Sequence, residues 1–169
     1  MTVLNIMKWP NAPLSTPCTE VTTFDESLRK FADDMLETMK HFKGIGLAAN
    51  QVGSSKRMFV ANAPDPGKDW DGKDMVFINP KIVSASGSEP FREGCLSFPD
   101  MYEFIVRSEA VSVAYQDIEG QHKIIEAKDL MAVVVQHEID HLDGKTFLDR
   151  MSRLKKEMFM KKLEKAWWL

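Results

Sequence analysis

The stretch Gln136-His137-Glu138-Ile139-Asp140-His141 carries the pattern H-E-x-x-H near the C-terminal end of the chain. On a helix, residues four apart share one face, so His137 and His141 can bind one metal ion. Glu138 stands beside the first histidine and can accept a proton from a water molecule that attacks a substrate. If the stretch is helical, it therefore predicts a metal-dependent hydrolytic site.

The residues around this pattern favour a helix over residues 129–141. The segment contains no glycine or proline, and Gly144 follows as a stop signal. An apolar stripe at helical spacing runs into the imidazoles and comprises Leu130, Val133, Val134, His137 and His141. The alternative is a pair of ordinary buried histidines. Two ligands are also too few, because a catalytic site of this kind uses three protein ligands and one open position.

The composition of the chain is that of an ordinary globular protein. Its 169 residues suit one domain spanning residues 1–169, with 44% hydrophobic and 28% charged residues. A net charge of -3 provides no basic excess for nucleic-acid phosphates. The longest apolar run is too short to cross a membrane, and the N-terminus lacks the features of a signal peptide. We therefore expect a cytoplasmic monomer without nucleic-acid or membrane partners.

The two cysteines, Cys18 and Cys95, are too few for a disulfide framework and fit a reducing compartment. Cys95 lies in Glu93-Gly94-Cys95-Leu96-Ser97, a turn-like segment between two groups of predicted strands. It is the natural candidate for the third ligand, although most free cysteines are small buried hydrophobes. Sequence spacing alone cannot bring Cys95 to His137.

Hydrophobic periodicity predicts further helices and a set of strands. The first helix covers residues 25–41, and the last runs from Ser152 to about Trp167 with its lysines on a solvated face. Alternating patterns predict strands over residues 57–62, 75–79, 81–85, 104–107, 110–115 and 123–127. Residues 3–9 are expected to form an extended arm.

The segment Gly44-Ile45-Gly46-Leu47-Ala48-Ala49-Asn50-Gln51 is rich in small residues, which lets the backbone approach another group closely. It is not a phosphate loop, because it lacks a Gly-Lys-Ser/Thr ending and no strand precedes it. Gln51 offers an amide that can donate a hydrogen bond to a ligand. A tight turn packed on the core explains the small residues equally well.

Residues 44–51, 93–97 and 136–141, taken together in this order, resemble the signature motifs of peptide deformylases. These enzymes remove the N-formyl group from nascent bacterial proteins, and the resemblance covers nearly the whole chain. It implies an α+β fold with antiparallel sheets around a central metal-binding helix. It also implies that Cys95 joins His137 and His141 around one divalent ion, usually Fe(II), with Zn(II) or others substituting.

The resemblance further implies roles for residues around the metal. Glu138 acts as the base, and the backbone N–H of Leu96 and the side-chain amide of Gln51 stabilise the oxyanion. The substrate is an N-formylmethionyl nascent peptide, whose methionine side chain occupies an apolar pocket. The residues expected to bind it are Gly44, Ile45, Gly46, Phe91, Glu93, Gly94, Leu130, Val133 and Val134. Glu93 is expected to pair with Arg107, and the ribosome stays open as a second partner.

Two other functions remain open at this point. A zinc metalloprotease of the H-E-x-x-H type takes its third ligand from downstream, here Glu157 or Glu164. A deformylase-like protein without activity would only bind peptide N-termini or ribosomes. The chain also departs from the family at Tyr102, where many bacterial members carry arginine, and at residues 10–14, in place of Asp-Pro-x-Leu-Arg. These departures leave open the contacts beyond the methionine and the anchoring of the N-terminal arm.

Overall fold

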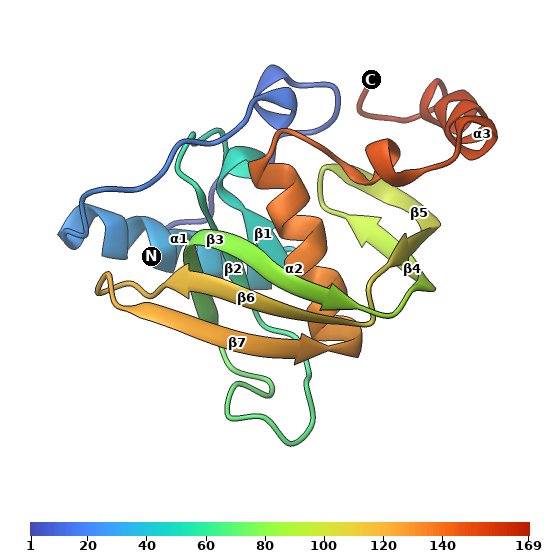
Figure 1. Ribbon diagram of the computed structural model, residues 1–169. Helices are drawn as coiled ribbons and strands as arrows, with labels where there is room; N and C mark the ends of the chain where they lie inside the picture. The colour runs from blue at the N-terminus through green and yellow to red at the C-terminus, as the bar shows by residue number, and fades with distance from the viewer.

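The computed structural model describes residues 1–169, and its α+β architecture confirms the predicted fold class (Figure 1). Three short 3-10 turns, η1, η2 and η3, occupy Ala12–Ser15, Ala49–Val52 and Phe147–Arg150. The helices and strands are α1 (Glu26–His41), β1 (Gly46–Ala48), β2 (Met58–Ala61), β3 (Met75–Ser86), β4 (Glu89–Cys95), β5 (Phe98–Arg107), β6 (Ala110–Gln116), β7 (His122–Lys128), α2 (Asp129–Leu142) and α3 (Arg153–Leu163).

Two antiparallel sheets surround α2. The larger has the order β1-β2-β3-β6-β7, and the smaller consists of β4 and β5. Figure 1 shows α2 crossing the centre of the molecule, with the larger sheet on one side and the β4–β5 hairpin on the other. The helix fills the largest hydrophobic cluster with Met131, Ala132, Val135, Ile139 and Leu142. The opposite face of α2, which carries the histidines, therefore faces the hairpin.

The predicted first helix is confirmed as α1, which packs on the other side of the strands. Its N-terminus is capped by Asp25, whose carboxylate accepts a hydrogen bond from the Leu28 N–H at 2.9 Å. Its apolar side is buried against β1, β2 and β3 and includes Leu28, Ala32, Met35 and Met39. No helix of the structure has both the length and the apolar character needed to cross a membrane.

Residues 75–79 and 81–85, predicted as separate strands, form the single strand β3. Its pairing with β6 shifts between Ile78 and Lys81, where Asn79 adopts a φ of 52°. The Asn79 side chain forms two hydrogen bonds with the backbone of Val21. It accepts one from the Val21 N–H and donates one to the Val21 carbonyl, both at 2.8 Å. A β-bulge at Asn79-Pro80 thus interrupts the alternating pattern without ending the strand.

The segments around Cys95 and Gly46, which were expected to be turns, are partly strands. Residues 89–95 form β4, which pairs with an extended β5 beginning at Phe98, and Leu96 and Ser97 make the turn between them. Cys95 therefore ends a strand rather than sitting in a loose turn. Gly46 likewise begins a short strand, β1, which pairs with β2 along the edge of the larger sheet.

The last helix is shorter than predicted. α3 ends at Leu163, so Trp167 lies beyond it in the C-terminal segment. Of the apolar residues in this segment, Phe159 and Leu163 are buried against Phe98 and neighbouring residues. Leu154, Met158 and Trp167 are exposed. The difference arises because α3 lies at the periphery of the molecule, at the far right of Figure 1, and touches the core with only a narrow stripe.

Candidate active site

The three predicted metal ligands converge on one point. The Cys95 Sγ atom lies 3.3 Å from His141 Nε2, and the Nε2 atoms of His137 and His141 are 3.2 Å apart. Tetrahedral coordination at bond lengths of about 2.0–2.3 Å places ligand atoms roughly 3.3–3.7 Å apart, so the donor spacing suits one metal ion. The helical spacing of the histidines is confirmed. The end of β4 brings in Cys95, which spacing alone could not place.

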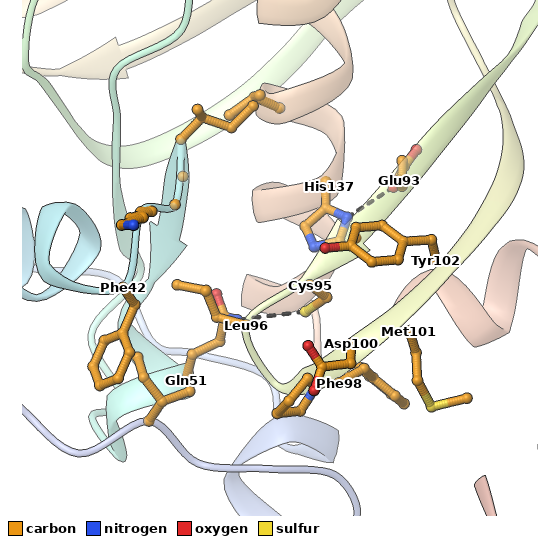
Figure 2. Close-up of a pocket in the computed structure, with 18 of the residues that line it drawn as sticks. Phe42, Gln51, Glu93, Cys95, Leu96, Phe98, Asp100, Met101, Tyr102 and His137 are labelled. Atoms are coloured by element: carbon orange, nitrogen blue, oxygen red, sulfur yellow. Dashed lines mark hydrogen bonds and ion pairs between the residues drawn. The ribbon is translucent and has the colours of Figure 1, made fainter. Parts of the chain in front are cut away.

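A hydrogen bond to Glu93 fixes the orientation of His137. The Nδ1 atom of His137 lies 2.8 Å from Glu93 Oε1, so Nδ1–H donates and Nε2 is free to bind a metal (Figure 2). Burial opposes a charge on His137, but hydrogen bonds with Cys95 and Glu93 raise its pKa well above its ordinary value. Burial and the neighbouring His137 lower the pKa of His141 well below its ordinary value. The surroundings thus favour a positive charge on His137 and disfavour a second one on His141.

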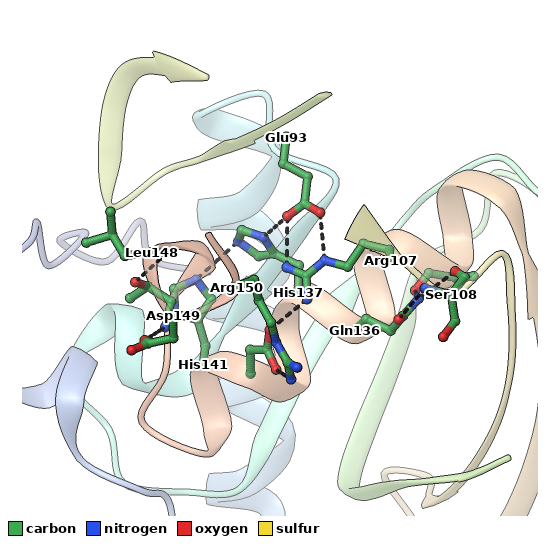
Figure 3. A network of polar contacts seen from close by, with 12 residues as sticks. Glu93, Arg107, Ser108, Gln136, His137, His141, Leu148, Asp149 and Arg150 are labelled. Atoms are coloured by element: carbon green, nitrogen blue, oxygen red, sulfur yellow. Dashed lines mark hydrogen bonds and ion pairs between the residues drawn. The ribbon is translucent and has the colours of Figure 1, made fainter. Parts of the chain in front are cut away.

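Arg107 ties this arrangement to the rest of α2 (Figure 3). Its guanidinium donates two hydrogen bonds to Glu93, at 2.7 and 2.9 Å, and one to Asp140 at 2.7 Å. Arg150 donates two more to Asp140. The expected pair of Glu93 and Arg107 is therefore present and extends to Asp140 and Arg150. Sequence periodicity had not indicated Arg150, because its partner lies ten residues away across a turn.

Both carboxylates of this network are held ionised. Burial works against the charge of Glu93, but hydrogen bonds from Arg107 and His137 outweigh it and lower its pKa below the ordinary value. For Asp140, burial is likewise outweighed by Arg150 and Arg107, and its pKa is lowered too. An ionised Glu93 accepts a stronger hydrogen bond from the Nδ1–H of His137. This bond helps to hold the His137 ring with Nε2 toward the metal site.

Glu138 is in a different environment. It is 4% exposed, and its Oε2 atom has no hydrogen-bond partner in the protein. Burial raises the pKa of Glu138 to about 7. A carboxyl group that titrates near neutrality can both accept and return a proton at physiological pH. A buried oxygen without a partner, next to His137 and lining the same cavity, suits a group that interacts with an attacking water molecule.

The amide of Gln51 is oriented by the backbone. Its Oε1 accepts a hydrogen bond from the Ala48 N–H at 2.9 Å. Its Nε2 therefore points toward Ser97 Oγ at 3.1 Å and Cys95 Sγ at 3.6 Å, as Figure 2 shows for the contact with sulfur. Ser97 was not predicted as a site residue, although it closes the segment 93–97 that carries part of the family resemblance. It is fully buried and holds the Gln51 amide beside the ligands.

A cavity of about 830 Å³ opens beside these groups. The predicted site residues that line it are Gly44, Ile45, Gly46, Gln51, Glu93, Gly94, Cys95, Leu96, Leu130, Val133, Val134, His137 and Glu138. His141, which is fully buried, lies behind them. Sequence reasoning missed the contributions of the N-terminal arm, including Ile6 and Lys8, and of Trp167. The arm reaches the cavity because the Met7 and Trp9 N–H groups bond to Gln51 and Ser97 carbonyls.

Phe91 is the one predicted site residue that lies apart from this arrangement. It is half-buried, pairs with Ile105 across the hairpin, and does not line the cavity. Phe91 precedes Cys95 by four residues on an extended strand, roughly 13 Å at the usual rise of about 3.3 Å per residue. The apolar wall of the cavity comes instead from the predicted face of α2, with Leu130, Val133 and Val134.

Comparisons with known proteins agree with this geometry. The family model described as polypeptide deformylase matches residues 3–157. The chain is 43% identical to a peptide deformylase of Rhizobium meliloti over 167 residues, covering 98% of this chain and 95% of the relative. The chain belongs to the polypeptide deformylase family. A Helicobacter pylori peptide deformylase is 44% identical, covering 97% of this chain and 95% of the relative.

Solved deformylase structures share the fold of this deformylase. The crystal structure of the Ehrlichia chaffeensis peptide deformylase superposes with a TM-score of 0.88 at 41% identity, covering 97% of this chain and 96% of that chain. The structure of that enzyme in complex with actinonin gives a TM-score of 0.90 at 43% identity, covering 98% of each chain.

The structure does not support the metalloprotease alternative, because neither proposed third ligand lies at the metal site. Its third ligand would be Glu157 or Glu164, and both side chains are exposed on or just beyond α3. Glu157 instead accepts from Arg153 at 3.2 Å, an ordinary pair within one helix. The cluster of potential metal ligands in the structure comprises only Cys95, His137 and His141.

Replacing Gly46 with alanine is expected to lower kcat/KM by about 10- to 100-fold through displacement of Glu138. A Cβ atom at Gly46 would lie 2.6 Å from Glu138 Oε1 and 2.9 Å from Val134 Cγ1, and both neighbours are held in α2. Gly94→Ala should have a smaller effect, because its new Cβ meets the Tyr102 ring, which is 52% exposed and can rotate away. Steady-state rates with unchanged metal content test this, and equal losses in the two variants would contradict it.

Proposed function

We propose that this deformylase removes the formyl group from N-formylmethionyl nascent peptides and releases formate, with Cys95, His137 and His141 holding one divalent ion. The observation that carries the proposal is the buried Glu138 carboxyl, which has an oxygen without a protein partner and lines the same cavity as Cys95 and His137. A base, a set of three ligands and an apolar pocket are the parts that hydrolysis of a formyl-methionyl amide requires.

The reaction adds water across the amide bond between the formyl carbon and the methionine nitrogen. When bound, the ion lowers the pKa of water and withdraws electron density from the formyl oxygen. Glu138 accepts a proton from the attacking water and later delivers it to the departing nitrogen. A carbon–oxygen bond forms and the carbon–nitrogen bond breaks, which yields formate and a free amine. The Gln51 amide and the Leu96 N–H donate hydrogen bonds to the formyl oxygen as it becomes negative.

The methionine side chain is proposed to occupy the apolar part of the cavity. Leu130, Val133 and Val134 form one wall along α2, and Ile45, with 41% of its surface exposed, also lines the cavity. Gly46 and Gly94 leave their backbones open, so the substrate can pair with them like an added strand. An apolar pocket of this kind favours methionine over polar or charged side chains.

Fe(II) is the ion that we propose for the native enzyme. A thiolate and two imidazoles bind both Fe(II) and Zn(II), so the ligand types allow either ion. A thiolate next to Fe(II) makes the site sensitive to oxygen, through oxidation of the metal or the sulfur. The iron form should therefore lose activity in air faster than a zinc form of the same protein.

The wider setting follows from the substrate. We propose that residues 1–169 work as a single catalytic domain and as a monomer in the cytoplasm. The nascent chains on which it acts emerge from the ribosome, so the ribosome is a further proposed partner. With a net charge of -3, direct recognition of nucleic acid is not part of the proposal.

Formate release from formyl-Met-Ala-Ser tests the function. Protein purified without oxygen and loaded with Fe(II) is expected to release formate from this peptide and not acetate from acetyl-Met-Ala-Ser. A zinc-loaded sample and a chelator-treated sample report the dependence on the ion. If folded, iron-loaded protein releases no formate, the proposed function is wrong, and assays for peptide-bond cleavage or peptide binding alone follow.

Replacing Gln51 with leucine is expected to lower kcat by about 100- to 1,000-fold, the usual cost of removing one oxyanion donor. The KM should change little, because the hydrogen bond strengthens mainly in the transition state. Circular dichroism and metal analysis verify that the variant is folded and loaded. Ser97→Ala is the informative companion, since it removes a group that contacts the Gln51 amide but not the amide itself. Unimpaired turnover of a folded Gln51→Leu protein would refute the role.

A further inference from the structure

A second cavity adjoins the proposed active site. Its volume is about 450 Å³, and it lies between the start of β5 and the end of α3. The two cavities have six lining residues in common, namely Arg92, Pro99, Asp100, Met101, Tyr102 and Trp167. The remaining residues of the second cavity come from α3 and the C-terminal segment, including Lys162 and Lys165. A ligand that begins at the metal site and continues past Tyr102 therefore enters this cavity.

Two adjacent tryptophans line the second cavity, and one of them, Trp167, also lines the first. Trp168 is half-buried, packs on the cluster around Phe98, and donates a hydrogen bond from its Nε1 to the Trp9 carbonyl at 2.9 Å. This anchor leaves Trp167 displayed at the rim with 69% of its surface exposed. Lys8 lies 5.7 Å from the Trp167 ring on one side, and Asp100 accepts from its indole N–H at 3.4 Å. A large aromatic side chain fixed in this way offers a rigid contact surface to a peptide.

The second cavity is rich in unpaired positive charge. Arg92, Lys162 and Lys165 line it, and none of them forms an ion pair. The Arg92 guanidinium is held 4.4 Å from the centre of the Tyr102 ring. Asp100 is the only acidic residue in the lining, and its carboxylate already faces the Trp167 indole. The chain as a whole has a net charge of -3, so this excess of cations is local.

The hairpin directs the substrate toward these charges. Gly94, the proposed backbone partner of the substrate, pairs with Tyr102 across the hairpin, and a Cβ on Gly94 would lie 2.7 Å from the Tyr102 ring. A peptide that pairs with Gly94 therefore meets Tyr102 and its stacked Arg92 directly beyond the methionine. Trp167, Lys162 at the end of α3 and Lys165 just beyond it follow on the far side of these residues.

We propose that the second cavity binds the substrate residues that follow the methionine and favours peptides with acidic side chains there. The inference rests on the proposed function and adds a preference to it. Cations that line a cavity raise the affinity for carboxylates and speed their association, and both effects weaken as salt is added. The first substrate residue after the methionine lies at Gly94 and Tyr102. The preference for acidic side chains therefore applies to the second to fourth residues after the methionine.

The test compares two C-terminally amidated peptides, formyl-Met-Ala-Asp-Asp-Ala and formyl-Met-Ala-Asn-Asn-Ala, which differ in charge but hardly in shape. We expect kcat/KM to be about three- to tenfold higher for the aspartate peptide at low salt, as exposed ion pairs of modest strength allow. The double variant Lys162→Glu/Lys165→Glu should abolish or reverse this ratio. The matched control is Lys156→Glu/Lys161→Glu, which makes the same charge change on exposed positions of α3 that line neither cavity.

The outcomes separate the preference from the reaction itself. Turnover of the asparagine peptide by the wild type reports the deformylase activity whatever the ratio is. If wild-type protein treats both peptides equally, or if the control double variant lowers the ratio as much as Lys162→Glu/Lys165→Glu does, the proposal is overturned. A ratio that falls only in the cavity variant, and that also falls with added salt in the wild type, supports it.

Discussion

Glu138→Gln is expected to lower kcat for formate release by about 100- to 10,000-fold, the range that general acid–base catalysis contributes. The reason lies in the position of Glu138, which is buried beside His137 and next to the Gly46 backbone. The other carboxyl groups that line the cavity are already engaged, Glu93 by Arg107 and Asp100 by the Trp167 indole. Glutamine keeps the size and shape of the side chain but can neither accept nor return the proton. Metal binding should persist, because Glu138 is not one of the three ligands.

The measurement pairs steady-state rates with the metal content of each variant. Glu157→Gln, an exposed glutamate of α3, is the matched control and should keep wild-type rates. Glu138→Ala adds a second comparison, since a cavity at this position admits water that can partly replace the base. A Glu138→Gln protein that holds its metal and retains more than about a tenth of the wild-type rate would show that another group moves the proton.

The ligand helix illustrates what sequence periodicity predicts well. The spacing of His137 and His141 and the apolar stripe before them depend only on the helical repeat, and both are found in α2. The larger sheet was also predicted in outline. Local pattern fails at β4, where Pro90 and Gly94 interrupt the strand signal. The small hairpin is exposed on one side and mixes buried charges, Glu93 and Arg107, with apolar residues on the other, so its burial pattern differs from that of a core strand.

The charged network shows where local pattern gives no information. Nothing in the periodicity distinguishes Glu93, Arg107 and Asp140 from ordinary surface charges, yet all three are buried. They come from β4, β5 and α2 and meet only when the hairpin packs against the helix. Cys95 reaches the histidines by the same packing. The resemblance to a known family joined Glu93 to Arg107 and Cys95 to the histidines, but the place of Asp140 in the network came only from the structure.

Replacing Arg107 with methionine is expected to lower the free energy of unfolding by about 3–5 kcal/mol at neutral pH, the usual cost of leaving a buried charge without its partner. Arg107 is 4% exposed and is the partner of both Glu93 and Asp140. Methionine fills much of the volume of arginine. The decrease in the free energy of unfolding therefore reflects removal of the positive charge and not the opening of a cavity. Denaturant unfolding of zinc-loaded protein at one fixed free zinc concentration measures it, since bound metal adds to the apparent stability.

The pH dependence of this loss identifies its cause. The folded protein lowers the pKa values of Glu93 and Asp140. Their ionised forms therefore stabilise the wild type fully at pH values above the ordinary carboxyl pKa. This stabilisation is lost as the pH falls through the lowered pKa values. In Arg107→Met those carboxyls protonate at higher pH, so the difference from wild type should shrink on acidification. Arg150→Met is the control, because the Arg150 side chain is 48% exposed and Asp140 keeps its bond to Arg107. Equal losses in the two variants, or a loss independent of pH, would mean that Arg107 stabilises the fold by packing and not by charge.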